Sequence, residues 1–114
     1  MAREQFQTLT EPMYYILLSL LSEVCGVDIM DRVHELSRGR VSVGPGTLYT
    51  LLDKFVKVGM IEETKMLGRK KHYVITKEGV QALKREQERL CMLLEDGQML
   101  KDYQGKAMAE GESV

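Results

Sequence analysis

Residues 45–59 read PGTLYTLLDKFVKVG. Pro45 suits the first turn of a helix, where its missing N–H is not needed, and Gly59 stops the helix. One side of this helix is apolar and carries Leu48, Leu51, Leu52, Phe55 and Val56. The other side carries Thr47, Thr50, Lys54 and Lys57. The segment therefore predicts a helix with a buried apolar side and an outward polar side.

Two further helices are predicted before this one. Thr10 is a suitable N-cap and Pro12 lies in the first turn of a helix that Gly26 ends. The apolar stripe of this first helix is Met13, Ile16, Leu17, Leu20 and Val24. A second helix is predicted from about Asp28 to Ser37, and the turn-forming composition of residues 41–46 separates it from the next helix.

A β-hairpin with a basic tip is predicted after Gly59. Residues 60–67 and 72–76 are typical of strands. Between them, residues 68–71 read GRKK. Gly68 favours the positive φ of a tight hairpin turn, and this role is structural whatever the tip binds.

The last predicted helix begins after Thr76, which can cap it. Its narrow stripe contains Val80, Leu83, Gln87, Leu90 and Leu94, at spacings of three and four. A narrow stripe of this kind pairs with another helix or packs back on its own domain, and we expect the first, a homodimer. Residues after Gly97 are rich in Gly, Glu, Ser and Lys, so we expect the tail to fray.

This order of elements predicts a mainly α (α+β) fold, a winged helix-turn-helix with a two-stranded β wing and a long C-terminal dimerisation helix. The length of 114 residues fits one domain. We expect a winged-helix DNA-binding domain over residues 1–77, a dimerisation helix over residues 78–103 packed with it as one unit, and a disordered tail over residues 104–114.

Charge is distributed unevenly along the chain, although the net charge is only −1. From Arg38 to Lys77 there are nine Lys or Arg and three acids, whereas the preceding part carries a net charge of −4 and the following part −3. Ordinary solvated charges can produce such a pattern. A basic surface that binds a polyanion is the interpretation we favour.

The predicted partner is double-stranded DNA, with the third helix in the major groove and the hairpin tip at phosphates or the minor groove. Thr47 and Thr50 contact DNA or are solvated surface. The Tyr49 ring packs at the helix junction or its hydroxyl reaches a phosphate. The two arginines beside the turn contact phosphates or compensate a helix C-terminus. The predicted DNA-binding residues are Arg38, Arg40, Gly46, Thr47, Tyr49, Thr50, Lys54, Gly68, Arg69, Lys70, Lys71 and Tyr73.

Other classes of function lack support in the sequence. No nucleophile and base set, carboxylate pair or phosphate-cradling loop is evident, so we predict no enzyme and no cofactor. Cys25 and Cys91 lie far apart, outside any metal-ligand spacing, and are interpreted as reduced packing residues, so no metal is expected. The sequence shows no membrane span and no signal peptide, which favours a cytoplasmic protein.

Several motifs together resemble the PadR family of bacterial regulators. The most specific are residues 45–49, PGTLY, and residues 68–73, GRKKHY. The resemblance extends over roughly residues 9–94. The other matching positions are 10–12 (TEP), 25–29 (CGVDI), 39–40 (GR), Leu52, Phe55, Gly59, Ile61, 75–76 (IT) and Gly79.

The resemblance implies a winged-helix homodimer, usually a repressor, whose C-terminal helix crosses to the partner subunit and often frames an effector pocket. The chain looks like the smaller subfamily, which has a single C-terminal helix. Val27 stands where the family often has an aromatic residue, and the C-terminal helix has no Trp, so a stacking pocket is not assured. Met13, Met92 and Met99 are interpreted as lining a pocket or, more commonly for Met, as core.

The predicted function is sequence-specific DNA binding at an inverted-repeat operator, by a repressor that a small hydrophobic or aromatic effector relieves. The alternative is a winged-helix module that binds protein and not DNA. Such a module does not need the basic tip.

Overall fold

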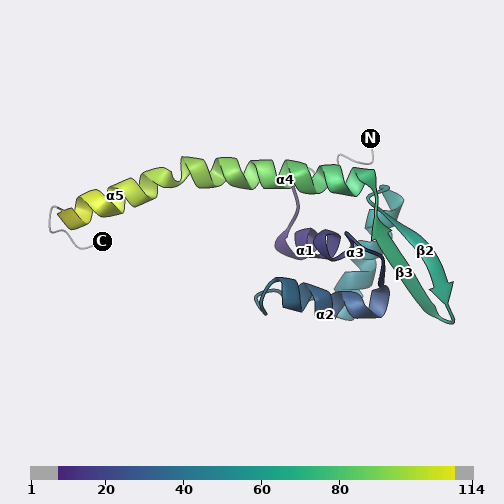
Figure 1. The fold of residues 1–114 in the computed structure, drawn as a ribbon. Helices are drawn as coiled ribbons and strands as arrows, with labels where there is room; N and C mark the ends of the chain where they lie inside the picture. Colours follow the sequence, from purple (N-terminus) through teal and green to yellow (C-terminus); the bar gives the residue numbers. More distant parts are fainter. Residues whose placement is uncertain (1–7, 110–114) are drawn as a thin grey trace. The chain divides into compact units, whose positions relative to one another are not determined.

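The computed structural model describes residues 8–109 (Figure 1). The chain divides into two compact units, one ending at Lys84 and one beginning at Arg85. The first unit contains three helices, three strands and the start of a fourth helix. The second contains the rest of that helix and a fifth. The division lies seven residues after the predicted domain boundary at residue 77, so the first turns of the fourth helix belong to the winged-helix unit.

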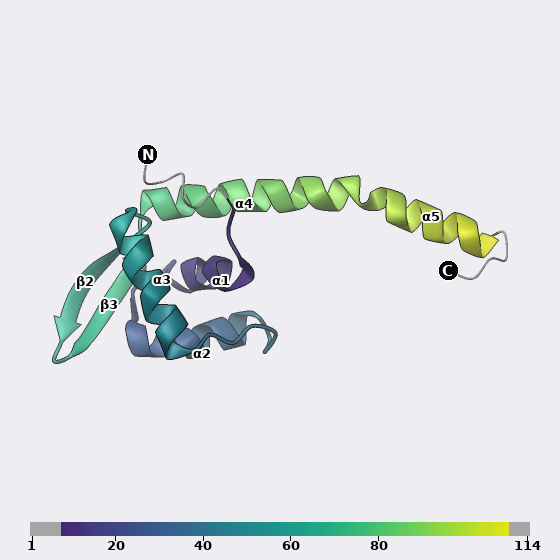
Figure 2. The same ribbon diagram turned by 180° about the vertical axis from the view of Figure 1, so that it is seen from behind.

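Three helices form the centre of the first unit: α1 (Glu11–Ser19), α2 (Gly26–Leu36) and α3 (Pro45–Lys57). Figures 1 and 2 show them packed together, with α2 facing the viewer in the first view and α3 in the second. The core residues with no solvent exposure are Ile16, Leu17, Leu20, Ile29, Val33, Leu48, Leu52 and Phe55. The apolar periodicity of the sequence is thus the pattern that builds this core.

Helix α1 is shorter than predicted. Thr10 caps it as expected, since the Met13 amide donates to the Thr10 hydroxyl over 3.4 Å. The helix ends at Ser19, however, and Val24 lies in a short strand, β1 (Val24–Cys25). Val24 pairs with Tyr73, so the hydrogen bonds of a sheet replace the last helical turn that the spacing predicted.

The sheet has three antiparallel strands in the order β1-β3-β2, one more than predicted. Strands β2 (Ile61–Leu67) and β3 (Lys70–Ile75) form the wing, which projects from the helices in Figure 1. The turn is tighter than predicted, because only Gly68 and Arg69 lie between the strands. Gly68 has a φ of 64°, as the sequence predicted for a tight turn.

Helix α3 begins and ends close to its predicted limits. Its inner side is buried as predicted at Leu48, Leu52 and Phe55. Val56 differs, because it is 39% exposed although the periodicity placed it on the inner side. It lies at the edge of the apolar stripe, where small differences in helix rotation decide burial.

The end of α3, the base of the wing and the start of α4 (Lys77–Asp96) meet at Thr76. The Thr76 hydroxyl donates to the Gly59 carbonyl over 2.5 Å and accepts from the Gly79 amide over 3.2 Å. The Thr76 amide donates to the Met60 carbonyl over 2.9 Å. Thr76 thus caps α4, as predicted, and also ties that helix to the turn after α3.

The C-terminal helix is interrupted. Helix α4 ends at Asp96, Gly97 lies in a turn, and α5 (Gln98–Ala109) follows. The prediction of one continuous helix over residues 78–103 is therefore wrong, because Gly97 favours a break within it. The predicted tail also begins too early, since residues 104–109 are helical; residues 110–114 lie outside the described part.

Gly79→Ala should lower the free energy of unfolding by about 1–3 kcal/mol, the usual range for overpacking. A Cβ at Gly79 would overlap the Met60 carbonyl oxygen and the Ile75 side chain. Denaturant unfolding followed by circular dichroism measures the effect. Gly105→Ala is the control, because it is also helical but has open space around its Cβ position. Unchanged stability of Gly79→Ala would contradict the close packing described for this junction.

Candidate nucleic-acid interface

The outward side of α3 carries short polar side chains and lysine. Thr47, Thr50 and Lys54 are exposed. Gly46 is exposed as well, and a Cβ placed there would have no neighbour within 4 Å. This side of the helix is therefore accessible to a partner as large as a nucleic-acid duplex.

A cleft of about 360 Å³ lies between α3 and the wing. Tyr49 and Asp53 line it from α3, and Gly26 lines it from the start of α2. From the wing come residues 69–71, which are one arginine and two lysines, and Tyr73. The cleft thus has Tyr49 and Asp53 of α3 on one side and the basic tip of the wing on the other.

Tyr49 packs against the first residue of α2. Its ring Cε1 and its hydroxyl each lie 3.4 Å from the position that a Cβ on Gly26 would take. The Tyr49 side chain is still 39% exposed. The sequence left open whether the Tyr49 ring packs at the helix junction or its hydroxyl reaches a phosphate. The observed position is compatible with both roles.

Tyr73 is only 3% exposed, although it was predicted to contact DNA. Its ring lies 3.4 Å from the Cβ position of Gly26 and belongs to the core. Burial, foremost, and then the negative charges of Glu63 and Asp53 raise the pKa of Tyr73, so its hydroxyl stays protonated. Alternation along β3 turns this side chain inward, which corrects its predicted role.

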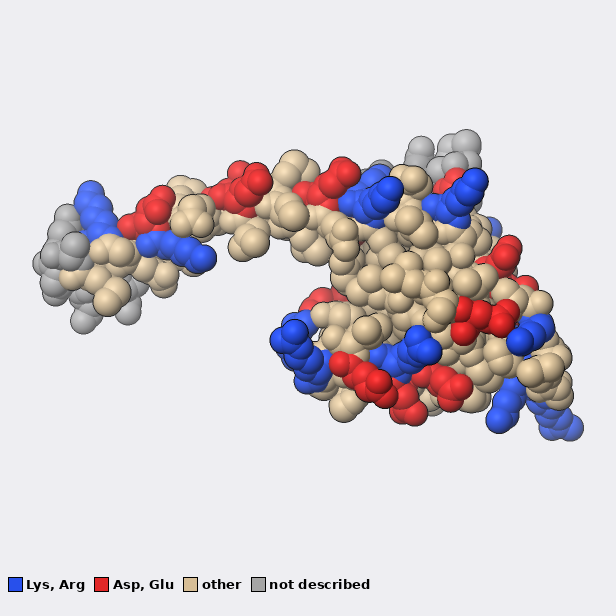
Figure 3. Space-filling model, viewed as in Figure 1, with Lys and Arg blue, Asp and Glu red and all other residues tan. Residues whose placement is uncertain are grey.

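The cations of the wing differ in their partners. Lys65 forms an ion pair of 3.2 Å with Glu23, and Lys71 one of 3.7 Å with Glu63. Hydrogen bonds from Thr64 and Lys65 lower the pKa of Glu23, which keeps this carboxyl ionised. Within residues 8–109, no acid forms an ion pair with Arg69 or Lys70. Figure 3 shows the resulting basic projection at the tip of the wing.

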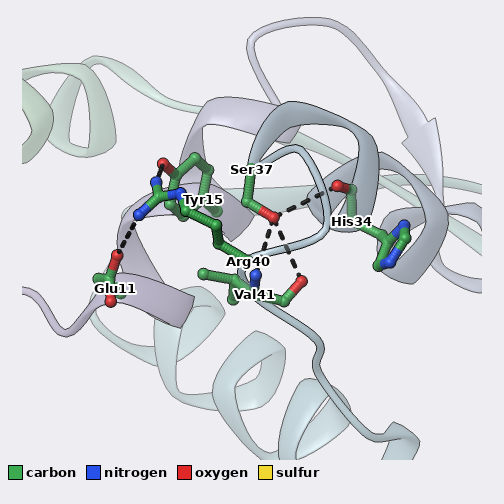
Figure 4. A network of polar contacts seen from close by, with 6 residues as sticks. All are labelled: Glu11, Tyr15, His34, Ser37, Arg40 and Val41. Atoms are coloured by element: carbon green, nitrogen blue, oxygen red, sulfur yellow. Dashed lines mark hydrogen bonds and ion pairs between the residues drawn. The ribbon is translucent and has the colours of Figure 1, made fainter.

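The turn after α2 holds Arg40 against α1 (Figure 4). The Arg40 guanidinium donates to the Tyr15 hydroxyl over 2.6 Å and lies 3.4 Å from the Glu11 carboxylate. It also lies 5.9 Å from the centre of the Tyr15 ring. Arg40 thus links α1 to the turn after α2. The sequence suggested phosphate contact or compensation of a helix C-terminus for this residue, and not this link. Arg38 is exposed and has a φ of 56°, a value that is uncommon for a residue other than glycine.

Ser37 fixes the backbone of the same turn. Its buried hydroxyl accepts from the Val41 amide over 3.0 Å and lies 3.3 Å from the carbonyls of His34 and Val41 (Figure 4). The Val41 amide therefore has a partner although it is buried. This contact sets the path of the chain between α2 and α3.

Acidic residues gather on a different side of the first unit. Asp28, Asp31 and Glu35 of α2 line a hollow of about 480 Å³ together with Glu23. Figure 3 shows acidic side chains, with some basic ones among them, on the face where α2 lies toward the reader, whereas α3 lies toward the reader in Figure 2. The structure thus separates the acids of α2 from the polar side of α3.

The predicted dimerisation residues fall in two groups. Val80 is half-buried and Leu83 is 5% exposed, and Leu83 belongs to the core of the first unit. Leu83 therefore has its partners in its own chain, which corrects its predicted role. Gln87 is exposed, and the exposed fractions of Leu90 and Leu94 are 43% and 74%.

Three residues that line the cleft are absent from the predicted DNA-binding set: Gly26, Val27 and Asp53. Asp53 follows Tyr49 by four positions, so helical spacing alone places both on one side. The nine cations of residues 38–77 outnumber the three acids, so the net positive charge of this segment conceals Asp53. Among residues 8–109 no three His, Cys, Asp or Glu gather as metal ligands. No helix in this range has the length and hydropathy of a membrane span.

Three helices followed by a β wing, with an open polar side on the third helix, define a winged helix-turn-helix protein. Residues 16–85 match the transcriptional regulator PadR-like family. The match covers more than half of the chain. The chain therefore belongs to the PadR-like family and is a DNA-binding transcriptional regulator, not an enzyme.

Solved structures share the fold. RosR of H. salinarum is 23% identical with a TM-score of 0.63, and the alignment covers 90% of this chain and 96% of RosR. A transcriptional regulator from Clostridium thermocellum is 22% identical, also with a TM-score of 0.63, over 82% of this chain and 93% of that one. No curated protein matches the sequence.

Ser37→Ala should lower the free energy of unfolding by about 1–3 kcal/mol, because it leaves the buried Val41 amide without its partner. Ser42→Ala, in the same turn but exposed, is the matched control and should change stability by less than about 0.5 kcal/mol. Thermal and denaturant unfolding of both variants measure the difference. Equal stability of the two variants would contradict the role given to Ser37.

Proposed function

We propose that α3 enters the major groove of double-stranded DNA and that the wing contacts phosphates or the adjacent minor groove. The observation that carries this proposal is the continuity of the open side of α3 with the cleft and the basic tip. A major groove about 12 Å wide admits one helix. Cations at the tip that lack acidic partners are available to phosphates.

The residues on this surface have different proposed roles. Thr47 and Thr50 contact base edges, and Lys54 contacts phosphate. Tyr49 keeps its ring against α2 and offers its hydroxyl to a phosphate. Gly46 lets the backbone approach the DNA closely. Arg38 contacts phosphate beside the turn, whereas Arg40 is engaged with α1 in the free protein.

We also propose that two copies of the chain pair through the C-terminal helices. The second unit exposes many large apolar side chains: Leu90, Met92, Leu93, Leu94, Met99, Leu100, Tyr103 and Met108. Leaving such side chains in water forfeits about 1.5–3 kcal/mol for each one that burial could cover. A second copy offers the same apolar surface, and an interface that uses it twice is two-fold symmetric.

A two-fold dimer places two recognition helices about 34 Å apart, one turn of DNA, so we propose an inverted-repeat operator. We further propose that the protein is a repressor in the cytoplasm of a bacterium. The exposed Met92 and Met99, with their adaptable side chains, favour a small hydrophobic or aromatic effector that releases it. Met13, which the sequence also suggested for an effector pocket, is only 7% exposed and lies in the core, so we do not include it among the effector-binding residues.

Replacing Arg69, Lys70 and Lys71 together by Ala should weaken binding to all DNA sequences, because phosphate contacts carry affinity and little sequence information. The slope of log affinity against log salt should fall by about 2–3. The control replaces Arg32, Lys77 and Lys84, which removes the same charge elsewhere in the first unit. Fluorescence anisotropy at several salt concentrations compares the two. If both variants keep the wild-type slope, the protein-binding alternative gains support.

Replacing Thr47 and Thr50 by Ala should reduce the affinity for operator DNA more than the affinity for unrelated DNA. The reason is that base-edge contacts discriminate between sequences, by about 1–3 kcal/mol for a good contact. The ratio of the two dissociation constants is the quantity to measure. If both constants change by the same factor, the threonines only position the helix.

Leu90→Glu should weaken the dimer and operator binding together, because a buried charge without a partner is costly. Sedimentation velocity at micromolar concentration measures the association. Gln81→Glu adds the same charge at an exposed polar position of α4 and should leave the dimer intact. A monomeric wild type, or a Leu90→Glu variant that dimerises fully, would contradict the proposed interface.

A further inference from the structure

Asp53 is an acid on the surface that is otherwise suited to a polyanion. It follows Thr50 by three positions and Tyr49 by four, so it shares their side of α3. Its side chain is exposed and lines the cleft opposite the three basic residues of the wing tip. A DNA duplex that occupies α3 and the wing would therefore meet this carboxylate.

The carboxylate of Asp53 is not neutralised by an ion pair. Among residues 8–109, Glu11, Glu23, Glu63 and Glu86 form ion pairs, whereas Asp53 has no cation within 4.0 Å. Its negative charge acts on Tyr73, which also lines the cleft, because it contributes to raising the pKa of that side chain. The cleft thus combines cations at the tip with one negative charge beside them.

A negative charge here has opposite effects on phosphates and on certain bases. It repels every phosphate that comes near, so it lowers the affinity for DNA of any sequence. An ionised carboxylate only accepts hydrogen bonds. In the major groove the groups that donate are the N4 amino group of cytosine and the N6 amino group of adenine.

Cytosine is the better of these two partners. Adenine presents the acceptor N7 beside its amino group, and that lone pair repels a carboxylate. Cytosine presents its amino group without an acceptor of its own in the groove. A site that places cytosine opposite residue 53 therefore offsets the repulsion, and other bases do not.

We infer that Asp53 determines sequence specificity, by accepting a hydrogen bond from a cytosine amino group in each half-site and by disfavouring all other DNA. This inference rests on the proposed placement of α3 in the major groove. It assigns to one carboxylate a selective role that the cations of the wing cannot have, since they bind phosphates of any sequence.

Selection of binding sites from a random duplex pool tests the inference, with the wild type and the Asp53→Asn variant. The wild type should select cytosine at one position of each half-site. Asp53→Asn should select adenine there, because an amide can bond adenine N6 and N7 together. The variant should also bind unrelated DNA more tightly and lose about 10-fold or more of the ratio between specific and unrelated DNA.

Glu62→Gln is the matched control, because it removes the same charge from an exposed position of the wing outside the cleft. It should keep the wild-type base preference. Circular dichroism checks that each variant is folded, and Asp53→Ala serves as a second variant that should lose the cytosine preference without gaining adenine. An Asp53→Asn variant with the wild-type preference and ratio overturns the inference alone. A wild type that selects no sequence overturns the proposed function and the inference with it.

Discussion

The structure of the first unit depends on the hydrogen bonds of one side chain, Thr76. Its hydroxyl bridges the Gly59 carbonyl after α3 and the Gly79 amide at the start of α4. Gly79 lies so close to the Met60 carbonyl that no side chain fits there. The end of α3, the base of the wing and the first turn of α4 are therefore held together at a single junction. A rigid junction is what a groove-binding helix and a phosphate-binding wing need in order to act together.

Acidic and basic side chains lie on different parts of the first unit. The near-neutral chain places the acids of α2 around one hollow and leaves the wing tip basic. Lys65 and Lys71 have acidic partners, whereas Arg69 and Lys70, at the turn, have none within the part of the chain described. Because screening by salt acts within about 10 Å at ordinary ionic strength, local charge and not net charge controls binding to DNA. In the proposal, Asp53 adds discrimination between bases to that of Thr47 and Thr50, whereas the cations of the wing bind phosphates of any sequence.

The sequence predicted the elements in which buried residues follow a single helical or strand periodicity. The predictions were wrong where tertiary contacts override that periodicity. Helix α3, with Pro45 at its start and Gly59 after its end, and the positive φ of Gly68 were predictable because local rules decide them. Val24 continued a helical stripe, but pairing with Tyr73 places it in a strand. Leu83 shared a stripe with Leu90, yet only Leu83 reaches the core of the first unit. The engagement of Arg40 by Tyr15 and Glu11 joins residues 25 and 29 positions apart, which no local pattern reveals.

The proposed function requires DNA to bind along α3 and the wing tip. Amide chemical-shift changes in the ¹⁵N-labelled protein, followed during titration with a duplex selected by the wild type, test this contact. The changes should be concentrated at Thr47, Thr50 and residues 68–71, and Asp31 and Glu35 on the acidic side of α2 should be unaffected. Changes confined to the acidic side of α2, with α3 and the wing tip unchanged, would contradict it.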